Sequence, residues 1–391
     1  MTKQRLVITE CGVATSLGCC IENMMQNIAR GTSNFQKHLQ MPETAVWKPN
    51  VAYINDDLLS NGINIRILRK LDRFTLLIMQ AFQQVHSRLI LDSAKIEDFG
   101  ILLGNLTGGW TFVEPQLDEI YNNNFDALSP YVATAWFPTA PQGEISLQYK
   151  ISGYSKTFAA DALSTGYALE HACHLIRRGD LPGAFVGGVE APLSPLVYNA
   201  CIRREPISAS GQYLPFHQKS DGYLLGEGAG LFTVEPEESV AAEKQKILAR
   251  IAGMGIARSL PEAMRSCLDD ANVGPEKVNC IFLDAKGLPD YDNDEYNAIS
   301  QVFKQSPKLY LTTTKPLHGS LLAADFAVQV VIAVKSLEKQ TIPRGLWSSS
   351  ELIHPTVGKL VLDNPIDGKL ENVMINSRNL DGSSVSLLLS N

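Results

Sequence analysis

Short apolar runs alternate with longer segments of helical periodicity along the chain. Residues 6–9, 99–103 and 183–188 form short runs that are typical of buried strands, and the second of these ends at a glycine. Residues 71–91 instead have apolar positions at helical spacing, and residues 164–178 also read as a helix. Strands and helices that alternate in this way predict an α/β protein.

The same rhythm begins again after a charged, alanine-containing connection at residues 235–246. The strands predicted after it are 247–251, 278–283 and 309–311, followed by a closing pair at 373–375 and 385–389. The helices predicted there are 261–271, 294–303 and 321–337. Two halves of similar rhythm indicate a duplicated α/β unit, divided into residues 1–235 and 236–391.

The composition narrows the class of protein. With 45% hydrophobic and 19% charged residues among 391, the chain is too apolar for disorder and long enough for two domains. A net charge of −7 without a basic run argues against nucleic acid as a partner. The best membrane candidate, residues 321–334, is interrupted by Asp325 and Gln329, so we expect no membrane span.

The amino end and the cysteines favour a cytoplasmic protein. The first apolar run is too short for a signal peptide, and seven cysteines without a C-x-x-C pair fit free thiols. Four cysteines fall in predicted helices or strands and are expected to be buried apolar groups: Cys173, Cys201, Cys267 and Cys280. His171 and His174 could share a helix face, but no third ligand follows in pattern, so we expect no metal site.

The strongest single motif is S-D-G-Y-L-L-G-E-G-A-G at residues 220–230. Its glycines do not indicate a phosphate loop, because no Lys-Ser/Thr pair ends the motif and a strand follows it. The motif closely resembles the D-G-F-V-L-G-E-G-A-G signature of the β-ketoacyl synthases, the condensing enzymes of the thiolase fold. Further segments that resemble this family are 70–74, 175–180, 186–191 and 376–377. The resemblance implies a five-layered αβαβα thiolase fold over essentially the whole chain.

The position of the catalytic nucleophile departs from this family. A ketosynthase carries T-A-C-x-x-G at a helix start, where the helix dipole and the backbone N–H groups favour a thiolate. Residues 161–166 read D-A-L-S-T-G instead, so Leu163 stands at the nucleophile position. A hydrocarbon side chain cannot form a thioester.

Both catalytic histidines of the family are also replaced. The motif H-G-T-G-T-P reads D-A-K-G-L-P at residues 284–289, which places Asp284 at the first histidine. The motif K-S-x-x-G-H reads K-P-L-H-G-S at residues 315–320, which places Ser320 at the second. His318 lies two positions early, and we expect it to point elsewhere. The resemblance therefore implies a ketosynthase-like chain without a catalytic triad and without condensing activity of its own.

A chain that keeps the ketosynthase fold but has other residues at the three triad positions resembles the chain-length factor of type II polyketide synthases, the inactive partner of a ketosynthase. Residues 135–147, A-W-F-P-T-A-P-Q-G-E-I-S-L, are similar to the A-W-F-Y-A-x-x-T-G-Q-I-S-I stretch of those factors. The resemblance implies a heterodimer with an active ketosynthase through residues 105–165, with Tyr131, Trp136 and Phe137 at the interface. It also implies an acyl carrier protein as a partner and a role in setting the length of a poly-β-ketone, of the aromatic kind. It implies no metal or organic cofactor.

The resemblance further implies which residues measure the product. In chain-length factors, the first, fourth and eighth residues after a pair of glycines line the end of a channel shared between the subunits. The pair here is at residues 108–109, and the three residues are Trp110, Val113 and Leu117. Their spacing of three and then four places them on one helical face, as a channel wall requires, and an ordinary core stripe has the same spacing.

Three other functions remain open from the sequence. A residual malonyl-carrier-protein decarboxylase would use Ser164 or Asp284, although Leu163 replaces the glutamine that many chain-length factors carry at that position. An aryl-polyene ketosynthase uses similar inactive partner subunits. A free-standing homodimer would need no ketosynthase.

Overall fold

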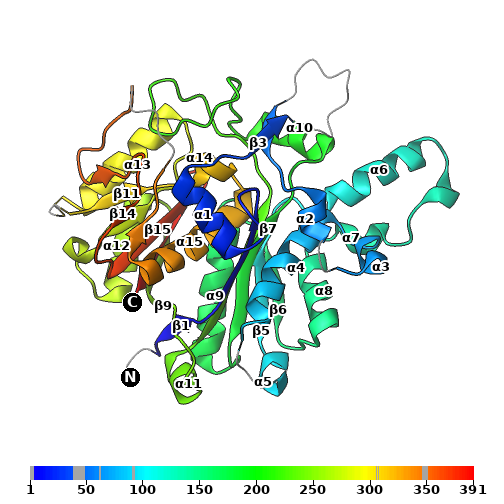
Figure 1. The fold of residues 1–391 in the computed structure, drawn as a ribbon, viewed down its shortest axis with the longest axis horizontal. Helices are drawn as coiled ribbons and strands as arrows, with labels where there is room; N and C mark the ends of the chain where they lie inside the picture. The colour runs from blue at the N-terminus through cyan, green and yellow to red at the C-terminus, as the bar shows by residue number, and fades with distance from the viewer. Residues whose placement is uncertain are drawn as a thin grey trace.

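The computed structural model describes residues 4–37, 49–60, 63–89, 93–304, 306, 308–345 and 351–391 (Figure 1). Within these residues the main sheet has twelve strands, in the order β13-β11-β10-β15-β16-β9-β1-β8-β7-β5-β6, with β2 also paired to β8. Strands from the first half of the chain are β1 (Leu6–Ile8), β2 (Cys11–Thr15), β5 (Gly100–Gly104), β6 (Ser155–Phe158), β7 (Ala184–Glu190) and β8 (Gly228–Pro236). Strands from the second half are β9 (Ala249–Ala257), β10 (Cys280–Phe282), β11 (Tyr310–Thr312), β13 (Lys359–Leu360), β15 (Asn372–Arg378) and β16 (Ser384–Ser390).

Helices lie on the faces of this sheet and between its two parts. The longer helices are α1 (Ile21–Arg30), α4 (Arg73–His86), α6 (Trp110–Tyr121), α8 (Ala140–Tyr149), α9 (Ser164–Arg178), α10 (Pro195–Arg204), α12 (Leu260–Ala271), α13 (Pro289–Val302) and α15 (Asp325–Lys339). The shorter ones are α2 (Asp56–Ser60), α3 (Ile65–Leu68), α5 (Ser93–Glu97), α7 (Val132–Trp136), α11 (Glu237–Ala242) and α14 (Lys315–His318). Two small strand pairs stand apart, β3 (Phe35–Lys37) with β4 (Asn50–Ala52) and β12 (Thr341–Ile342) with β14 (Ile366–Asp367).

The strand β1 joins the two halves of the sheet. Leu6 lies opposite Pro236 of β8 on one edge and opposite Ile251 of β9 on the other, and both pairings are antiparallel. All three residues of β1 are buried, which explains why its sequence is a continuous apolar run rather than an alternating one. The division of the chain at residue 235 stays a prediction, and β8 continues past this point to Pro236.

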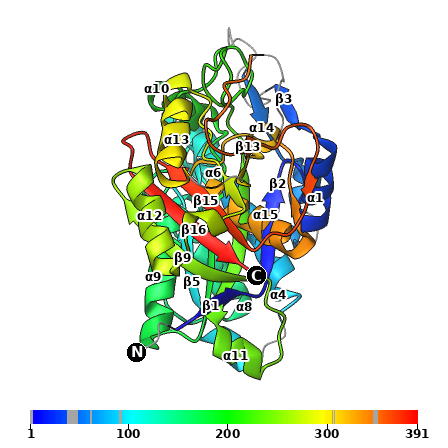
Figure 2. The same cartoon turned by 90° about the vertical axis from the view of Figure 1, so that its left-hand side faces the viewer.

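The elements form five layers, as the sequence predicted. From right to left in Figure 1 these are α4 with α8, the N-terminal strands, α9 with α15, the C-terminal strands, and α12 with α13. Figure 2 shows β15 and β16 crossing the molecule beside β9. The middle layer is the most apolar, because α15 packs against both parts of the sheet and is buried over nearly its whole length. No described helix has both the length and the apolar character that a membrane crossing requires.

Most of the predicted elements are confirmed. The helix predicted at residues 164–178 is α9, and it ends at Gly179, whose φ of 79° closes the helix in the left-handed region. The helix α4 is shorter than the predicted 71–91. It begins after Asp72, whose carboxylate accepts a hydrogen bond from the Phe74 N–H, and it ends at His86; residues 90–92 lie outside the described residues.

Several other predicted bounds differ from the structure, and three of these differences have a clear physical setting. The strand β9 extends beyond the predicted 247–251 to Ala257. Its added part contains Gly253 and Gly255, which allow α12 to pack closely, since a Cβ on Gly255 would lie 2.2 Å from a backbone carbonyl of α12. The helix α13 begins at Pro289 rather than at residue 294, since proline is tolerated in the first turn of a helix. The predicted connection after residue 235 contains a short helix, α11.

Candidate functional site

The predicted nucleophile position lies at the start of α9. Leu163 immediately precedes the helix, and its side chain is 1% exposed within the core between the two parts of the sheet. The hydroxyl of Ser164 donates a hydrogen bond to the Asp161 carbonyl (2.6 Å) and accepts one from the Ala160 N–H (2.9 Å). Because this hydroxyl is used to close the turn before α9, neither residue presents a nucleophile.

Asp284, at the first histidine position, is completely buried just after β10. Its Oδ1 accepts a hydrogen bond from Lys315 Nζ at 3.1 Å, while Lys286 Nζ and Arg378 Nε lie 3.7 and 3.8 Å from its Oδ2. Burial by itself raises the pKa of Asp284, but the charges of Lys286, Lys315 and Arg378 hold this pKa below its usual value. An ionised carboxylate has no proton to donate, so it cannot stabilise a developing anion as a histidine does.

Ser320, at the second histidine position, belongs to the same network. Lys315 Nζ lies 3.2 Å from Asp325 Oδ2, and this oxygen accepts a hydrogen bond of 3.0 Å from the Ser320 hydroxyl. Burial lowers the pKa of Lys315, but Asp284 and Asp325 outweigh it and raise that pKa above the usual value. Two of the three predicted triad positions are therefore connected through one buried, charged lysine.

Two buried carboxylates that no family motif singled out hold the loop after β10. The side chain of Glu295 accepts hydrogen bonds from the N–H groups of Asp284 (2.8 Å) and Ala285 (2.9 Å), and Asp292 accepts one from the Gly287 N–H (3.1 Å). Burial raises the pKa of Asp292 to about 8 and also raises that of Glu295. Both lie on α13 three residues apart, and this spacing of acids on a half-buried helix is the signal that could have indicated them.

His318 takes no part in this network. It is buried on α14, with Nε2 at 3.3 Å from Thr314 Oγ1. Burial lowers the pKa of His318 to about 4, so its imidazole is neutral at pH 7. It lines neither of the cavities beside the triad positions, which agrees with the prediction that it points elsewhere.

Two adjoining cavities lie between residues next to the predicted triad positions and the start of α6. The smaller cavity, of about 240 Å³, is lined in part by Ala162, next to Leu163, and by Lys286. The larger cavity, of about 620 Å³, is lined in part by Trp110 at the start of α6 and by side chains of α10. Four residues line both cavities: Leu106, Asp161, Glu205 and Leu322. Open space therefore lies beside the predicted triad positions, although none of Leu163, Asp284 and Ser320 lines either cavity.

Two family models match the chain. The model of the beta-ketoacyl synthase N-terminal domain matches residues 3–239, and that of the beta-ketoacyl synthase C-terminal domain matches residues 253–347. The chain belongs to the β-ketoacyl synthase family. Its architecture is the thiolase fold of these enzymes, and the assignment of Leu163, Asp284 and Ser320 to the triad positions stays a prediction.

Individual relatives include a 3-oxoacyl-(acyl-carrier-protein) synthase and two polyketide synthase proteins. The chain is 26% identical to 3-oxoacyl-(acyl-carrier-protein) synthase 2 of Coxiella burnetii, over all of this chain and 99% of that protein. It is 28% identical to the tetracenomycin polyketide synthase ketoacyl synthase beta subunit of Streptomyces glaucescens, over 83% of each chain. It is 30% identical to the actinorhodin polyketide putative beta-ketoacyl synthase 2 of Streptomyces coelicolor, over 71% of this chain and 72% of that protein.

Solved structures share the fold at lower identity. A chain of the ishigamide ketosynthase/chain length factor superposes over the full length of both chains with a TM-score of 0.86 and 21% identity. A chain of a ketosynthase in complex with its chain length factor, from Xenorhabdus doucetiae, gives a TM-score of 0.85 and 20% identity, over 99% of this chain and 98% of that one.

The three candidate gate residues of this synthase homologue lie on α6, which is helical as predicted. Trp110 is half-buried, lines the larger cavity, and packs edge-on against Trp136 with ring centroids 6.1 Å apart. Val113 is buried and Leu117 is half-buried, and neither lines that cavity. The structure therefore brings Trp110 to the cavity wall, and the gate role of all three residues stays a prediction.

The candidate interface residues lie near β6, the strand at one end of the main sheet. Trp136 and Phe137 are 41% and 51% exposed, whereas Tyr131 is half-buried with Lys70 Nζ 5.0 Å from its ring centroid. Figure 1 shows α6 and α7 projecting from the body beyond α2 and α4. The Thr157 hydroxyl of β6, the last strand of the main sheet, donates a hydrogen bond to the Pro138 carbonyl just after α7 (3.4 Å). The projecting part also exposes Tyr121 and Phe125.

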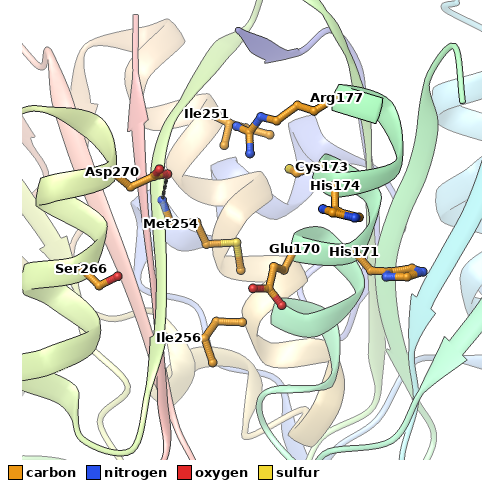
Figure 3. A pocket seen from close by; sticks show the side chains of 10 residues that line it. All are labelled: Glu170, His171, Cys173, His174, Arg177, Ile251, Met254, Ile256, Ser266 and Asp270. Atoms are coloured by element: carbon orange, nitrogen blue, oxygen red, sulfur yellow. Dashed lines mark hydrogen bonds between the residues drawn. The ribbon is translucent and has the colours of Figure 1, made fainter. Parts of the chain in front are cut away.

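A third cavity, of about 470 Å³, lies between α9 and β9 (Figure 3). His171 and His174 line it from α9 together with Arg177, and Asp270 faces them from α12. Over the described part of the chain, no group of three or more His, Cys, Asp or Glu side chains is placed to hold a metal ion. This cavity touches none of the triad positions.

The cysteines predicted to be buried apolar groups are indeed buried: Cys173, Cys201, Cys267 and Cys280. Cys201 lines the larger cavity, but burial raises the pKa of its thiol to about 12. A thiol that stays protonated at pH 7 is a poor nucleophile.

Proposed function

We propose that this chain is the non-condensing subunit of a ketosynthase pair that builds a poly-β-ketone on an acyl carrier protein, and that it sets the length of this product. The observation that carries the proposal is Leu163, a buried hydrocarbon at the nucleophile position of a β-ketoacyl synthase scaffold. Asp284 and Ser320 support it, because Asp284 is an ionised carboxylate with no proton to donate and the Ser320 hydroxyl is already donated to Asp325. The condensation then belongs to an active ketosynthase partner.

The names of several relatives and structural neighbours support this pairing with a ketosynthase. One is a ketoacyl synthase beta subunit of a polyketide synthase, and two structural neighbours are ketosynthase and chain length factor assemblies. Another neighbour, with a TM-score of 0.86 at 18% identity, comes from a type II acyl carrier protein in complex with its ketosynthase bound to a hexaketide. An aromatic polyketide is our preferred product class, because residues 135–147 resemble the corresponding stretch of chain-length factors.

The surface around the sheet edge fits a large partner. Its apolar side chains are exposed on α6, α7 and the segment between them: Ile120, Tyr121, Phe125, Trp136 and Phe137. Stable heterodimers bury about 800 Å² per subunit, and aromatic side chains contribute most strongly at the centre of such interfaces. We therefore assign this surface, together with the free edge of β6, to the ketosynthase.

The length of the product follows from the space beside Trp110. Its indole stands in the wall of a cavity that adjoins the smaller cavity beside Ala162 and Lys286, so it would limit how far a growing chain can extend. A bulky side chain at a packed wall resists displacement, since overpacking costs about 1–3 kcal/mol.

The experiment is Trp110→Ala in the heterodimer, reconstituted with its acyl carrier protein. Removing the indole frees space in the channel, and we expect products longer by at least one two-carbon unit, measured by mass spectrometry. Val113→Ala and Leu117→Ala should give smaller shifts, and Phe112→Ala, on the neighbouring face of α6, should lower yield without changing length. Unchanged length from a folded, active Trp110→Ala complex would show that the stop lies elsewhere.

The other functions left open by the sequence gain no support from the site. A residual decarboxylase would use Ser164, whose hydroxyl is engaged at the turn before α9, or Asp284, which is enclosed by three cations. An aryl-polyene system assigns the chain the same role beside a ketosynthase, and the mass of the reconstituted product distinguishes it. A homodimer without a ketosynthase is distinguished by native mass spectrometry of the co-expressed chains.

A further inference from the structure

Two buried carboxylates lie on either side of Trp110 in the sequence and hold the backbone next to it. The first is Glu190, the last residue of β7, which is completely buried. It accepts hydrogen bonds from the Leu106 N–H, the Thr107 hydroxyl and the Thr107 N–H, the last at 3.2 Å. Leu106 and Thr107 line the larger cavity together with Trp110, so Glu190 fixes the cavity wall just before the indole.

The second is Asp72, which is 1% exposed and caps two helices at once. Its Oδ1 accepts the Phe74 N–H at 2.9 Å and so caps α4. Its Oδ2 accepts the Thr111 hydroxyl (2.8 Å) and the Phe112 N–H (2.6 Å) in the first turn of α6. The helix α6 has no side-chain cap of its own, since Gly109 is at its N-cap, so Asp72 supplies the acceptor that this turn needs.

The segment between these two anchors has little freedom. Gly108, with φ of 71°, donates its N–H to the side chain of Asn105 at 2.9 Å. The Gly109 N–H donates to the Trp136 carbonyl at 3.1 Å, and a Cβ on Gly109 would lie only 2.2 Å from the Ala135 carbonyl oxygen. The backbone of Trp110 is therefore fixed from both sides.

Asp72 is itself anchored to the central sheet. Its neighbour Arg73 donates hydrogen bonds to both carboxylate oxygens of Glu227, at 2.5 and 2.6 Å. Glu227 lies directly before β8 in the 220–230 motif, while Asp72 and Glu190 belong to the 70–74 and 186–191 segments. Three segments that marked the family in the sequence thus meet behind the start of α6.

Placing these carboxylates in the interior is unfavourable by itself. Burial raises the pKa of Glu190 to about 7 and that of Asp72 to about 6, against the hydrogen bonds that lower both. Each carboxylate nevertheless lies where several hydrogen-bond donors from the start of α6, or from the residues just before it, point at its oxygens.

We propose that Glu190 and Asp72 are positioning residues, which hold Trp110 in the cavity wall and thereby set product length without touching the growing chain. This proposal rests on the proposed function. It assigns part of the length selectivity to hydrogen bonds behind the wall, whereas the proposed function assigns it to the indole.

The test compares Glu190→Gln and Asp72→Asn with the wild-type heterodimer, with Trp110 intact. Each amide loses one acceptor oxygen, so the start of α6 gains freedom. We expect the ratio of longer to normal products to rise about fivefold, the effect of one ordinary hydrogen bond on an equilibrium. The matched control is Glu235→Gln, since Glu235 is also buried, accepts a threonine hydroxyl (Thr9, 2.6 Å) and lies on β8. Its product ratio should stay at the wild-type value.

A conservative pair separates positioning from folding. Thr111→Val removes the hydroxyl that reaches Asp72 while keeping the shape of the side chain, and Thr111→Ser keeps the hydroxyl. We expect Thr111→Val to shift the product ratio and Thr111→Ser to restore it. An unchanged ratio in Glu190→Gln and Thr111→Val, alongside a length change in Trp110→Ala, would overturn this inference and leave the proposed function standing. No change in Trp110→Ala would instead overturn the proposed function.

Discussion

The surroundings of the predicted triad positions and the start of α6 adjoin the same pair of cavities, but their interiors are built in opposite ways. Around Leu163 and Asp284 the side chains are buried, Lys315 pairs with Asp284, and a hydrocarbon occupies the predicted position of the nucleophile. Around Trp110 the wall is half-buried and continues into exposed aromatic residues on α7. The first region, which we call the closed region, is buried throughout, while the second borders the larger cavity and exposed surface. Under the proposed function, a scaffold with this contrast acts through shape and association rather than through condensation chemistry of its own.

The closed region is stable only as a whole. Lys315 lies between Asp284 and Asp325, and Lys286 and Arg378 complete the charges around Asp284. Removing one member of a buried ion pair leaves its partner uncompensated, which costs more than the intact pair contributes. We therefore expect the largest effects of mutation on stability at this network.

The strongest test of this view is Lys315→Met. The substitution leaves Asp325 without a counter-ion in a buried site, and we expect the free energy of unfolding to fall by about 3–5 kcal/mol. Denaturant unfolding of the purified heterodimer measures the loss. Lys335→Met is the matched control, because Lys335 pairs with Glu338 near the surface and such pairs contribute about 1 kcal/mol or less. Equal losses in the two variants would show that the buried network is not the more costly one to break.

The difference between the two regions also explains which of their features could be predicted from the sequence. Short motifs contain the triad positions, so the replacements at Leu163, Asp284 and Ser320 could be read directly. The helix α9 was predicted with its observed bounds, because a glycine in the left-handed region ends it. The start of α13 was missed, since acidic residues in its first turns hide the apolar pattern.

The interactions between distant segments could not be predicted. Arg378 reaches Asp284 from a different strand, and Asp72 reaches Thr111 from a different helix. A hydrogen bond between such residues leaves no periodic signal in the chain, because each residue follows the pattern of its own element. For this reason the sequence marked the segments that contain Asp72 and Glu190 only by family resemblance, and gave no sign that their carboxylates reach the backbone beside Trp110.

The second prediction concerns the exposed region and is of intermediate size. Phe137 is half exposed and packs beside Trp136, with ring centroids 5.3 Å apart, at the surface assigned to the ketosynthase. Phe137→Ala should weaken the heterodimer about thirtyfold, since aromatic residues at an interface centre contribute about 2 kcal/mol each. Dissociation on dilution, followed by native mass spectrometry, gives the change. Leu58→Ala removes an equally exposed apolar side chain on α2 and should leave the affinity unchanged.

The third prediction expects no gain at all. Leu163→Cys restores the thiol at the start of α9, where the backbone N–H groups favour a thiolate. Intact-protein mass spectrometry first tests whether this thiol takes up an acyl group. Carbon–carbon bond formation should still be absent, because the enolate formed after decarboxylation needs proton donors at the two histidine positions. Asp284 is an anion there, and the Ser320 hydroxyl is already donated to Asp325. The assay measures condensation by Leu163→Cys in a heterodimer whose ketosynthase cysteine is replaced by alanine. A condensation product from that complex would mean that the closed region retains chemistry, and the contrast drawn above would fail.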